Sequence, residues 1–283
     1  MHRYTAIIGE KAGGEALAKS LRRAWPLLPE HAVREALRKR DVLVNGTRAG
    51  TGTRVKAGDE VVLYTRHGMQ EIPIVYEDEH YLIVNKPAGV NSDPNAYGGF
   101  SLIMWAESHA RGHYMPELCH RLDNQASGLC LLAKNEADGK TARQAFKGRD
   151  LIKIYECLVR GTPGRQEGTL RAWLIKDARR SRVWVTDTPA PEAREILTGY
   201  RILEAGEVTR LEVRLYTGRT HQIRAHLAHI GHPILGDDAY GDRAFNRAQG
   251  QPGLKLSAVS LAFPEASGIE SLRGRRFVVP APF

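Results

Sequence analysis

A polar stretch runs directly into an apolar segment at residues 120–133, and this junction limits the folds open to the chain. Residues 129–133 (Leu-Cys-Leu-Leu-Ala) form a short apolar run of the length typical of a buried strand. Asn124, Ser127 and Gly128, just before the run, favour turns. The pattern therefore predicts a loop at the rim of a buried sheet.

Arg121 and Asp123 lie in that predicted loop. Residues two apart in an extended chain point to the same side, so we expect their charged side chains to share one face. An acid at the rim of a sheet can serve catalysis, but Asp and Asn are also ordinary turn residues. The local pattern leaves both interpretations open.

The composition is that of an ordinary globular protein, with 42% hydrophobic and 26% charged residues in a chain of 283. This length can hold one large domain, or a large domain with a small one. No apolar run approaches the length of a membrane span, and the first residues do not resemble a signal peptide. The three cysteines show no Cys-x-x-Cys spacing. We expect a cytoplasmic protein that does not bind membranes.

Positive charge is concentrated in the first quarter of the chain. The formal net charge is +9, and residues 1–66 contain nine Arg and four Lys against seven acidic residues. Clustered basic side chains gain affinity for a phosphate backbone by displacing counterions. A basic surface that only serves solubility is the alternative, but the uneven placement favours a polyanion as partner.

The same region has the pattern of a small α/β module. Apolar spacing predicts helices over residues 15–24 and 30–40. Residues 42–46 (Val-Leu-Val-Asn-Gly) predict a strand closed by a tight turn, and residues 55–63 predict another turn and strand. Residues 65–73 are polar and carry Gly and Pro, which indicates a linker.

This module, with its basic helix, Val-Asn-Gly turn and Lys-Ala-Gly-Asp sequence, resembles the RNA-binding domain first described in small-subunit ribosomal protein S-four. His31 departs from the Ser that the family often has at the start of the second helix. The resemblance implies that four basic residues contact the RNA backbone: Arg34, Arg38, Lys39 and Arg40. Plain solvent exposure of these cations is the alternative. The expected domains are residues 1–66, which bind RNA, and residues 67–283.

Residues 218–233 predict a helix with a partly buried arginine. Thr220 is a good N-cap, and Gly231 with Pro233 would end the helix. At 100° per residue, Arg224 lies at the edge of the apolar stripe. An arginine at that edge can reach a partly buried carboxylate, or cover apolar surface with its stem.

Four histidines in this stretch invite a metal-site interpretation: His221, His226, His229 and His232. No two of them are spaced i, i+4 as in a helical zinc site, and no nearby cysteine completes a set. We therefore expect no metal.

Three separated stretches carry a more specific pattern: residues 120–128 (His-Arg-Leu-Asp-Asn-Gln-Ala-Ser-Gly), residues 153–161 (Lys-Ile-Tyr-Glu-Cys-Leu-Val-Arg-Gly), and residues 218–227 (Gly-Arg-Thr-His-Gln-Ile-Arg-Ala-His-Leu) with residues 231–241. In this order they resemble the motifs of RluA-type RNA pseudouridine synthases. Ala126 and Cys157 stand where that family usually has Thr and Ala, beside the matched polar positions. The resemblance implies an α+β fold, with a mixed, mostly antiparallel sheet flanked by helices and a small N-terminal α/β RNA-binding domain.

The resemblance also implies a reaction and the residues that perform it. The reaction isomerises uridine to pseudouridine within RNA, and no cofactor is expected because no atoms enter or leave. Asp123 would act as nucleophile at the anomeric carbon or as base at the adjacent sugar carbon. Arg224 would pair with Asp123, which keeps it ionised, and Tyr155 would stack on the uracil and assist proton removal from the ring carbon. Arg121 would hold the displaced strand, and Leu256 would line the uracil pocket.

The expected substrate is structured RNA, with large-subunit (23S) ribosomal RNA favoured and transfer RNA as an alternative. No obligate protein partner is implied. Two other classes of function remain open at this stage: a non-catalytic RNA-binding or ribosome-assembly protein, and another enzyme of nucleosides or sugars. A glycosidase normally needs two carboxylates flanking the scissile bond, whereas the matched motifs offer a single acid with a basic partner.

Overall fold

The computed structural model describes residues 1–9, 14–25, 27–69, 71–94, 100–177, 182–250 and 252–283. Within it the chain packs as two compact units. The first unit comprises Met1–Ile72 and Gly89–Trp105, and the second comprises Pro73–Ala88 and Ala106–Phe283. The assignment of RNA binding to residues 1–66 and of catalysis to residues 67–283 stays a prediction.

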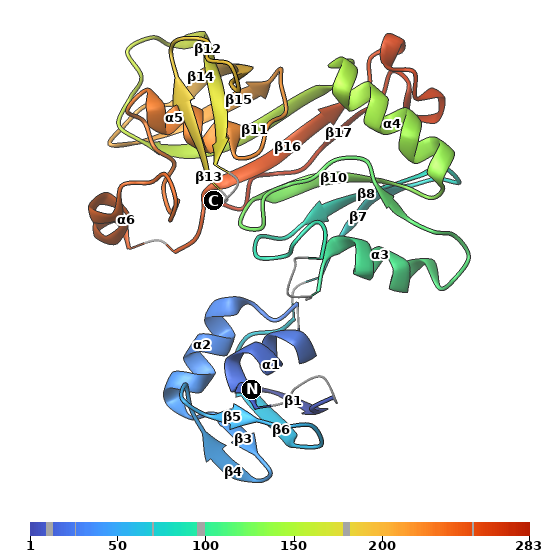
Figure 1. Ribbon diagram of the computed structural model, residues 1–283, viewed down its shortest axis with the longest axis vertical. Helices are drawn as coiled ribbons and strands as arrows, with labels where there is room; N and C mark the ends of the chain where they lie inside the picture. The colour runs from blue at the N-terminus through green and yellow to red at the C-terminus, as the bar shows by residue number, and fades with distance from the viewer. Residues whose placement is uncertain (10–13, 26, 70, 95–99, 178–181, 251) are drawn as a thin grey trace. The chain divides into compact units, whose positions relative to one another are not determined.

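Two helices and small sheets form the bulk of the first unit (Figure 1). The helices are α1 (Leu17–Ala24) and α2 (Glu30–Lys39). The four-stranded sheet has the order β1 (His2–Ile7), β6 (Glu60–Thr65), β3 (Val42–Val44), β4 (Thr47–Ala49), and β2 (Glu15–Ala16) pairs separately with β5 (Arg54–Val55). Both predicted helices are therefore confirmed.

The Asn-Gly turn and the apolar spacing of this unit behave as the sequence predicted. Asn45 and Gly46 have φ angles of 49° and 78°, which are the positive values that a two-residue hairpin turn between β3 and β4 requires. Leu17 and Leu21, spaced i, i+4 on α1, are fully buried. Helix α2 begins after Pro29 without a side-chain cap, so His31 lies inside the helix and does not cap it.

The second unit is built on one eleven-stranded sheet (Figure 1). Its strand order is β13 (Arg182–Thr186), β12 (Glu167–Asp177), β14 (Arg194–Glu204), β15 (Val208–Leu215), β11 (Ile152–Arg160), β16 (Leu256–Ala262), β10 (Ser127–Ala133), β8 (Tyr81–Lys86), β7 (Ile74–Glu77), with β17 (Arg276–Val278) on β16 and β9 (Glu117–Leu118) on β10. Across the described residues, β10 and β16 form the only parallel pair of neighbouring strands. Residues 178–181, between β12 and β13, lie outside the described residues.

Helices cover parts of this sheet. Helix α4 (Glu136–Gly148) packs against β9 and β10, and α5 (Gln222–His229) packs against β12, β13 and β14. Helix α3 (Leu102–Ala110) begins in the first unit and ends in the second, and α6 (Arg243–Gln249) and two short 3₁₀ turns (Glu265–Ser267, Glu270–Leu272) follow later. The mixed, mostly antiparallel sheet with flanking helices confirms the predicted α+β class. No helix in the described part of the chain is long and apolar enough to cross a membrane.

The two strands that carry the site motifs are largely buried. All seven residues of β10 are buried, which places the loop containing Asp123 at the end of an interior strand. On β11, Lys153, Tyr155, Cys157 and Val159 form the buried face, while the residues between them are only partly covered. The strict alternation of β11 thus turns Tyr155 inward.

Candidate active site

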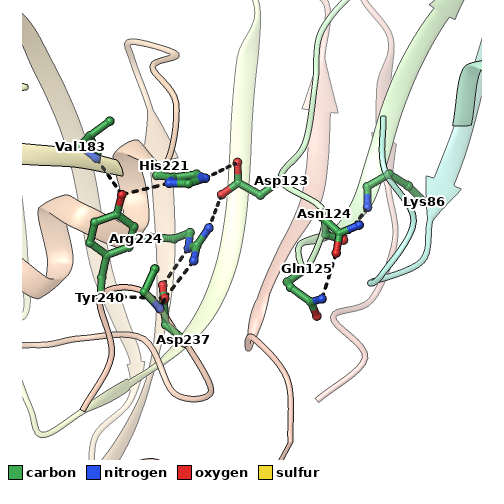
Figure 2. A network of polar contacts seen from close by, with 10 residues as sticks. Lys86, Asp123, Asn124, Gln125, Val183, His221, Arg224, Asp237 and Tyr240 are labelled. Carbon is green, nitrogen blue, oxygen red and sulfur yellow. Dashed lines mark hydrogen bonds and ion pairs between the residues drawn. The ribbon is translucent and has the colours of Figure 1, made fainter. Parts of the chain in front are cut away.

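The fold brings Asp123 into contact with Arg224, which is 101 residues away in the sequence (Figure 2). Asp123 lies in the loop before β10, and Arg224 lies in the first turn of α5. Nη1 of Arg224 donates to Oδ2 of Asp123 over 3.0 Å. The Asp123 side chain is 23% exposed, and that of Arg224 is 10% exposed. The carboxylate is therefore reachable from solvent while its basic partner is almost buried.

Arg224 is itself held by a second carboxylate, Asp237. Its Nε donates to Oδ2 of Asp237 over 2.7 Å, and its Nη2 donates to Oδ1 over 2.9 Å. This bidentate geometry is the strong, planar pairing of guanidinium with carboxylate. It uses the Nε–Nη2 edge of the guanidinium and leaves Nη1 to donate to Asp123.

Asp237 is fully buried, and the fold compensates its charge. Its Oδ1 also accepts hydrogen bonds from the backbone N–H groups of Ala239 (2.8 Å) and Tyr240 (2.9 Å). Burial alone would raise the pKa of Asp237, but the hydrogen bonds and charge of Arg224 outweigh it, and the pKa lies below its ordinary value. Burial also opposes the charge on Arg224, but its two carboxylate partners raise its pKa further. Both groups stay ionised.

Tyr155 and Leu256 lie in the apolar cluster beside this ionic array. The cluster contains Leu122, next in sequence to Asp123, together with Tyr155 and Leu256. Tyr155 is 8% exposed. Burial, and then the negative charge of Asp123, raise the pKa of its phenol, so the ring is a neutral phenol at pH 7. The structure thus brings four residues singled out in the sequence to one region of the second unit: Asp123, Tyr155, Arg224 and Leu256.

Arg121 and the basic residues of α2 have different surroundings. Arg121 is exposed two residues before Asp123. Arg34, Arg38, Lys39 and Arg40 are exposed in the first unit. Arg40 forms the left-handed C-cap of α2, and Lys39 pairs with Glu35 one turn earlier.

Asp237, Lys86 and His221 belong to the site, although no role was predicted for them. Asp237 occurs in the motif of residues 231–241, and the signal that could have found it is an acid two residues after the apolar pair Ile234 and Leu235, both buried. Lys86 is the last residue of β8, a strand whose other residues are mostly buried and apolar. Its charged side chain therefore also lies in the interior. The sequence pattern around His221 invites only a metal-ligand interpretation.

Thr220 was predicted to cap α5, and this prediction is wrong. The N-cap is His221, with φ at 53° and no side-chain cap. The backbone turns through the left-handed conformation at this residue, which moves the start of the helix one residue on. His221 thereby faces Asp123, with its Nε2 3.9 Å from Oδ1 (Figure 2).

Gly128 allows the loop that carries Asp123 to approach the neighbouring strand. Its φ is 112°, and a Cβ at this position would lie 2.3 Å from the backbone oxygen of Ala258 on β16. Any side chain would therefore push β10 and β16 apart at the point where they pair. A glycine is required here for the close approach.

Lys86 links β8 to the same loop from inside the protein. Its side chain is fully buried, and its Nζ donates to the backbone oxygens of Pro87 (3.0 Å) and Asn124 (3.3 Å). Figure 2 shows the ammonium directed at the residue after Asp123. Burial lowers the pKa of Lys86 to about 8, although the charges of Cys130 and Asp123 oppose the shift. Lys86 therefore anchors the backbone of the loop.

The lowered pKa of Lys86 makes a testable contribution to stability. Because the folded pKa of about 8 lies below the ordinary 10.5, the unfolded chain binds more protons between these values, and this contribution to stability rises with pH. We expect the free energy of unfolding of the wild type, minus that of Lys86→Met, to rise between pH 8 and 9.5 by up to about 1.4 kcal/mol per pH unit. Urea denaturation at each pH measures it. Lys140→Met, at an exposed position, is the control; a constant difference for Lys86→Met would contradict the assignment.

The described residues contain no group of three or more His, Cys, Asp or Glu side chains that could hold a metal ion. The histidines of residues 221–232 instead have separate partners. His226 contacts Thr198 through its Nδ1 (3.0 Å), His229 contacts Asp187 (2.8 Å), and His232 contacts the backbone oxygen of Arg160 (3.0 Å). The chemistry that this site offers is that of one reachable carboxylate, a fixed guanidinium and a buried phenol.

Comparison with known proteins identifies similar chains. Residues 80–229 match the family model described as RNA pseudouridylate synthase. The chain is 33% identical over 247 residues to an uncharacterized RNA pseudouridine synthase of Aquifex aeolicus, covering 80% of this chain and 77% of that protein. It is 32% identical over 281 residues to ribosomal large subunit pseudouridine synthase C of Vibrio cholerae, covering 90% and 87%.

A solved structure supports the same relationship. The human protein RNA pseudouridylate synthase domain containing 1 superposes with a TM-score of 0.62 at 26% identity, covering 75% of this chain and 84% of that one. The similarity thus extends beyond the three motifs to the fold.

Proposed function

The chain belongs to the RNA pseudouridylate synthase family, whose members isomerise uridine to pseudouridine, and we propose that its substrate is large-subunit ribosomal RNA. The name of the Vibrio cholerae relative, a ribosomal large subunit enzyme that matches 90% of the chain, supports this choice. We also propose that the protein works in the cytoplasm without an obligate protein partner.

The observation that carries the mechanism is the array Asp123–Arg224–Asp237. Isomerisation breaks the bond between the sugar and the base nitrogen, turns the uracil, and joins a ring carbon to the same sugar carbon. An ionised Asp123 can attack the anomeric carbon or remove a proton from the adjacent sugar carbon. Arg224 binds Oδ2 of Asp123 and leaves Oδ1 available, whether Asp123 attacks the anomeric carbon or removes the proton.

Tyr155 and Leu256 are proposed to hold the uracil. Both lie in the buried cluster beside Asp123, and a flat aromatic ring offers a surface on which a base can stack. A phenol with a raised pKa is a poor base at pH 7. The burial of Tyr155 therefore supports stacking more directly than assistance with proton removal.

Arg121 is proposed to contact the RNA strand from which the uridine is removed. Turning a base out of its stack costs a few kcal/mol, and contacts to the displaced strand or its phosphate recover part of this energy. Arg121 is exposed and lies two residues from Asp123, which suits a cation at the mouth of the site.

The basic module of residues 1–66 is proposed to dock the RNA. Its cations Arg34, Arg38, Lys39 and Arg40 are exposed. Arg38 and Arg40 also line a pocket of about 390 Å³ with Leu37 and residues 50–53. An open pocket with two guanidinium groups at its wall suits a phosphate of the backbone.

Mapping of pseudouridines tests the substrate. We expect one or a few uridines of large-subunit ribosomal RNA to remain unmodified in cells that lack the protein, and the purified protein alone to modify the same uridines in a transcript. Mass spectrometry of nuclease fragments measures both. Loss of pseudouridine only from transfer RNA would overturn the choice of substrate. Unchanged modification of all RNA would contradict the function itself.

A further inference from the structure

The two oxygens of Asp123 have different neighbours (Figure 2). Arg224 donates to Oδ2, whereas Oδ1 faces Nε2 of His221 at 3.9 Å. The His221 side chain is 22% exposed, so it lies between the interior and the surface, as Asp123 does. His221 belongs to the site by its position, but the family resemblance assigns it no role and the proposed mechanism does not use it.

A single donor does not fix the plane of a carboxylate. The χ2 angle of Asp is a soft rotation without sharp wells. Among the described residues Arg224 is the one hydrogen-bond donor to this carboxylate, so the plane of the Asp123 carboxylate can turn about that contact. A second donor on Oδ1 would define the plane, and with it the lone pair that Oδ1 presents to the sugar.

Tyr240 determines which nitrogen of His221 carries the hydrogen. The hydroxyl of Tyr240 lies 3.0 Å from Nδ1 of His221, and it accepts a hydrogen bond from the backbone N–H of Val183 over 3.0 Å. If the hydroxyl donates its hydrogen to Nδ1, all three groups are satisfied. If Nδ1 carried a hydrogen instead, the hydroxyl hydrogen would have no acceptor in the described part of the chain. The network therefore favours the tautomer with hydrogen on Nε2.

The charges around the ring favour the same tautomer. Four groups face His221: Asp123, Arg224, Asp237 and Tyr240. A carboxylate oxygen near Nε2 attracts an N–H and repels a lone pair. Burial lowers the pKa of His221, and although Asp123 opposes this shift, Arg224 adds to it. The ring is thus neutral at pH 7, with its one hydrogen directed at Asp123.

The backbone of His221 also departs from the ordinary. It takes a φ of 53° at the start of α5 and provides no side-chain cap. Left-handed backbone at a residue other than glycine is uncommon and concentrates at functional sites. Here this conformation is what turns the imidazole from the helix end to Asp123.

We propose that His221 is a positioning residue: with RNA bound, it donates its Nε2 hydrogen to Oδ1 of Asp123, so that His221 and Arg224 together fix the plane of the carboxylate. This inference rests on the proposed role of Asp123. The distance of 3.9 Å exceeds a hydrogen bond, but such contacts are often long before substrate binds and shorten in the complex.

A matched pair of variants tests the donor. His221→Gln keeps an N–H near the position of Nε2, whereas His221→Met has a similar length without a donor, and both residues meet the same strain at positive φ. We expect His221→Met to lower the single-turnover rate by about 10- to 100-fold, as a misplaced reacting group does. His221→Gln should stay within a few-fold of the wild type, and both should bind RNA with unchanged Kd. Equal rates for the two variants would overturn the proposal.

The tautomer can be measured without any activity. Nitrogen NMR of the full-length protein should show His221 with hydrogen on Nε2, its signals assigned by their loss in His221→Gln. In Tyr240→Phe, which retains the ring and loses the hydroxyl, the signals should shift toward a mixture of tautomers. Hydrogen on Nδ1 in the wild type would refute the network. Because this readout does not involve Asp123 chemistry, it separates a failure of this inference from a failure of the proposed function.

Discussion

Asp123→Asn is expected to lower the rate of pseudouridine formation by at least about 10³-fold, the upper range for removal of a group that transfers a proton or attacks the substrate. The amide has nearly the shape of the carboxylate, and its oxygen can still accept from Arg224. It cannot attack the sugar or hold a proton taken from it. The prediction therefore holds for both roles open to Asp123.

Single-turnover conversion of the RNA substrate, followed by mass spectrometry of the product, measures this rate. Binding of RNA to the variant should stay within about two-fold, because only one charge at the site is removed. Asp238→Asn, at an exposed position next to Asp237, is the matched control and should retain full activity. If Asp123→Asn kept a tenth or more of the wild-type rate, Asp123 would not be the reacting group.

Replacement of the four basic residues of the first unit by glutamine is expected to weaken RNA binding by about 10²- to 10³-fold near 0.15 M salt. The changed residues are Arg34, Arg38, Lys39 and Arg40. Each phosphate contact contributes about 0.7 to 0.9 to the slope of log K against log salt, so the loss of four contacts should flatten that slope by about 3. The rate at saturating RNA should change little, because these cations are not part of the Asp123 array.

A control set in the second unit separates docking from a general loss of charge. It consists of Lys140, Lys147, Arg149 and Arg165, which are exposed and carry the same total charge. Arg149 matches Arg40 closely, since both are left-handed C-caps, with φ angles of 69° and 57°. Fluorescence anisotropy over a range of salt concentrations measures both sets. An equal change of slope in the two sets would mean that the basic module is not the docking surface.

The salt dependence also distinguishes the module from the catalytic unit. A variant with a flattened slope and a normal rate at saturation would place docking in residues 1–66, as proposed. If the slope of log K against log salt stayed normal while the affinity for one RNA fell, contacts to the shape or the bases of that RNA would dominate the interaction.

Much of the fold could be predicted from the sequence, because it follows from patterns of short range. The apolar run of residues 129–133 predicted a buried strand, and these residues are all buried within β10. The alternation along β11 places Tyr155 on one face with Lys153, Cys157 and Val159, and the structure shows that this face is buried. The spacing of Leu17 and Leu21 predicted the covered side of α1. For β11 and α1 the period of the side chains alone decides which residues share a face.

The residues of the site were predicted in part, and through motif resemblance more than through local pattern. The local pattern around Asp123 also fits a plain turn residue, and the local pattern around Arg224 also fits an arginine that covers apolar surface. Their contact spans 101 residues, and no periodicity reports contacts over such a separation. The predicted pair is close in the structure because the sheet order brings β10 and the strands that support α5 into one unit.

What the sequence determined by itself is therefore several of the strands and helices, the basic module, and the three motifs that indicate the reaction. Only the tertiary structure decided how the charges are held: Asp237 buried behind Arg224, Lys86 beneath the loop at Asn124, and His221 turned toward Asp123 by a left-handed backbone. The physical reason is that burying a charge is favourable only when partners surround it, and those partners come from segments that the sheet, and not the local sequence, brings together.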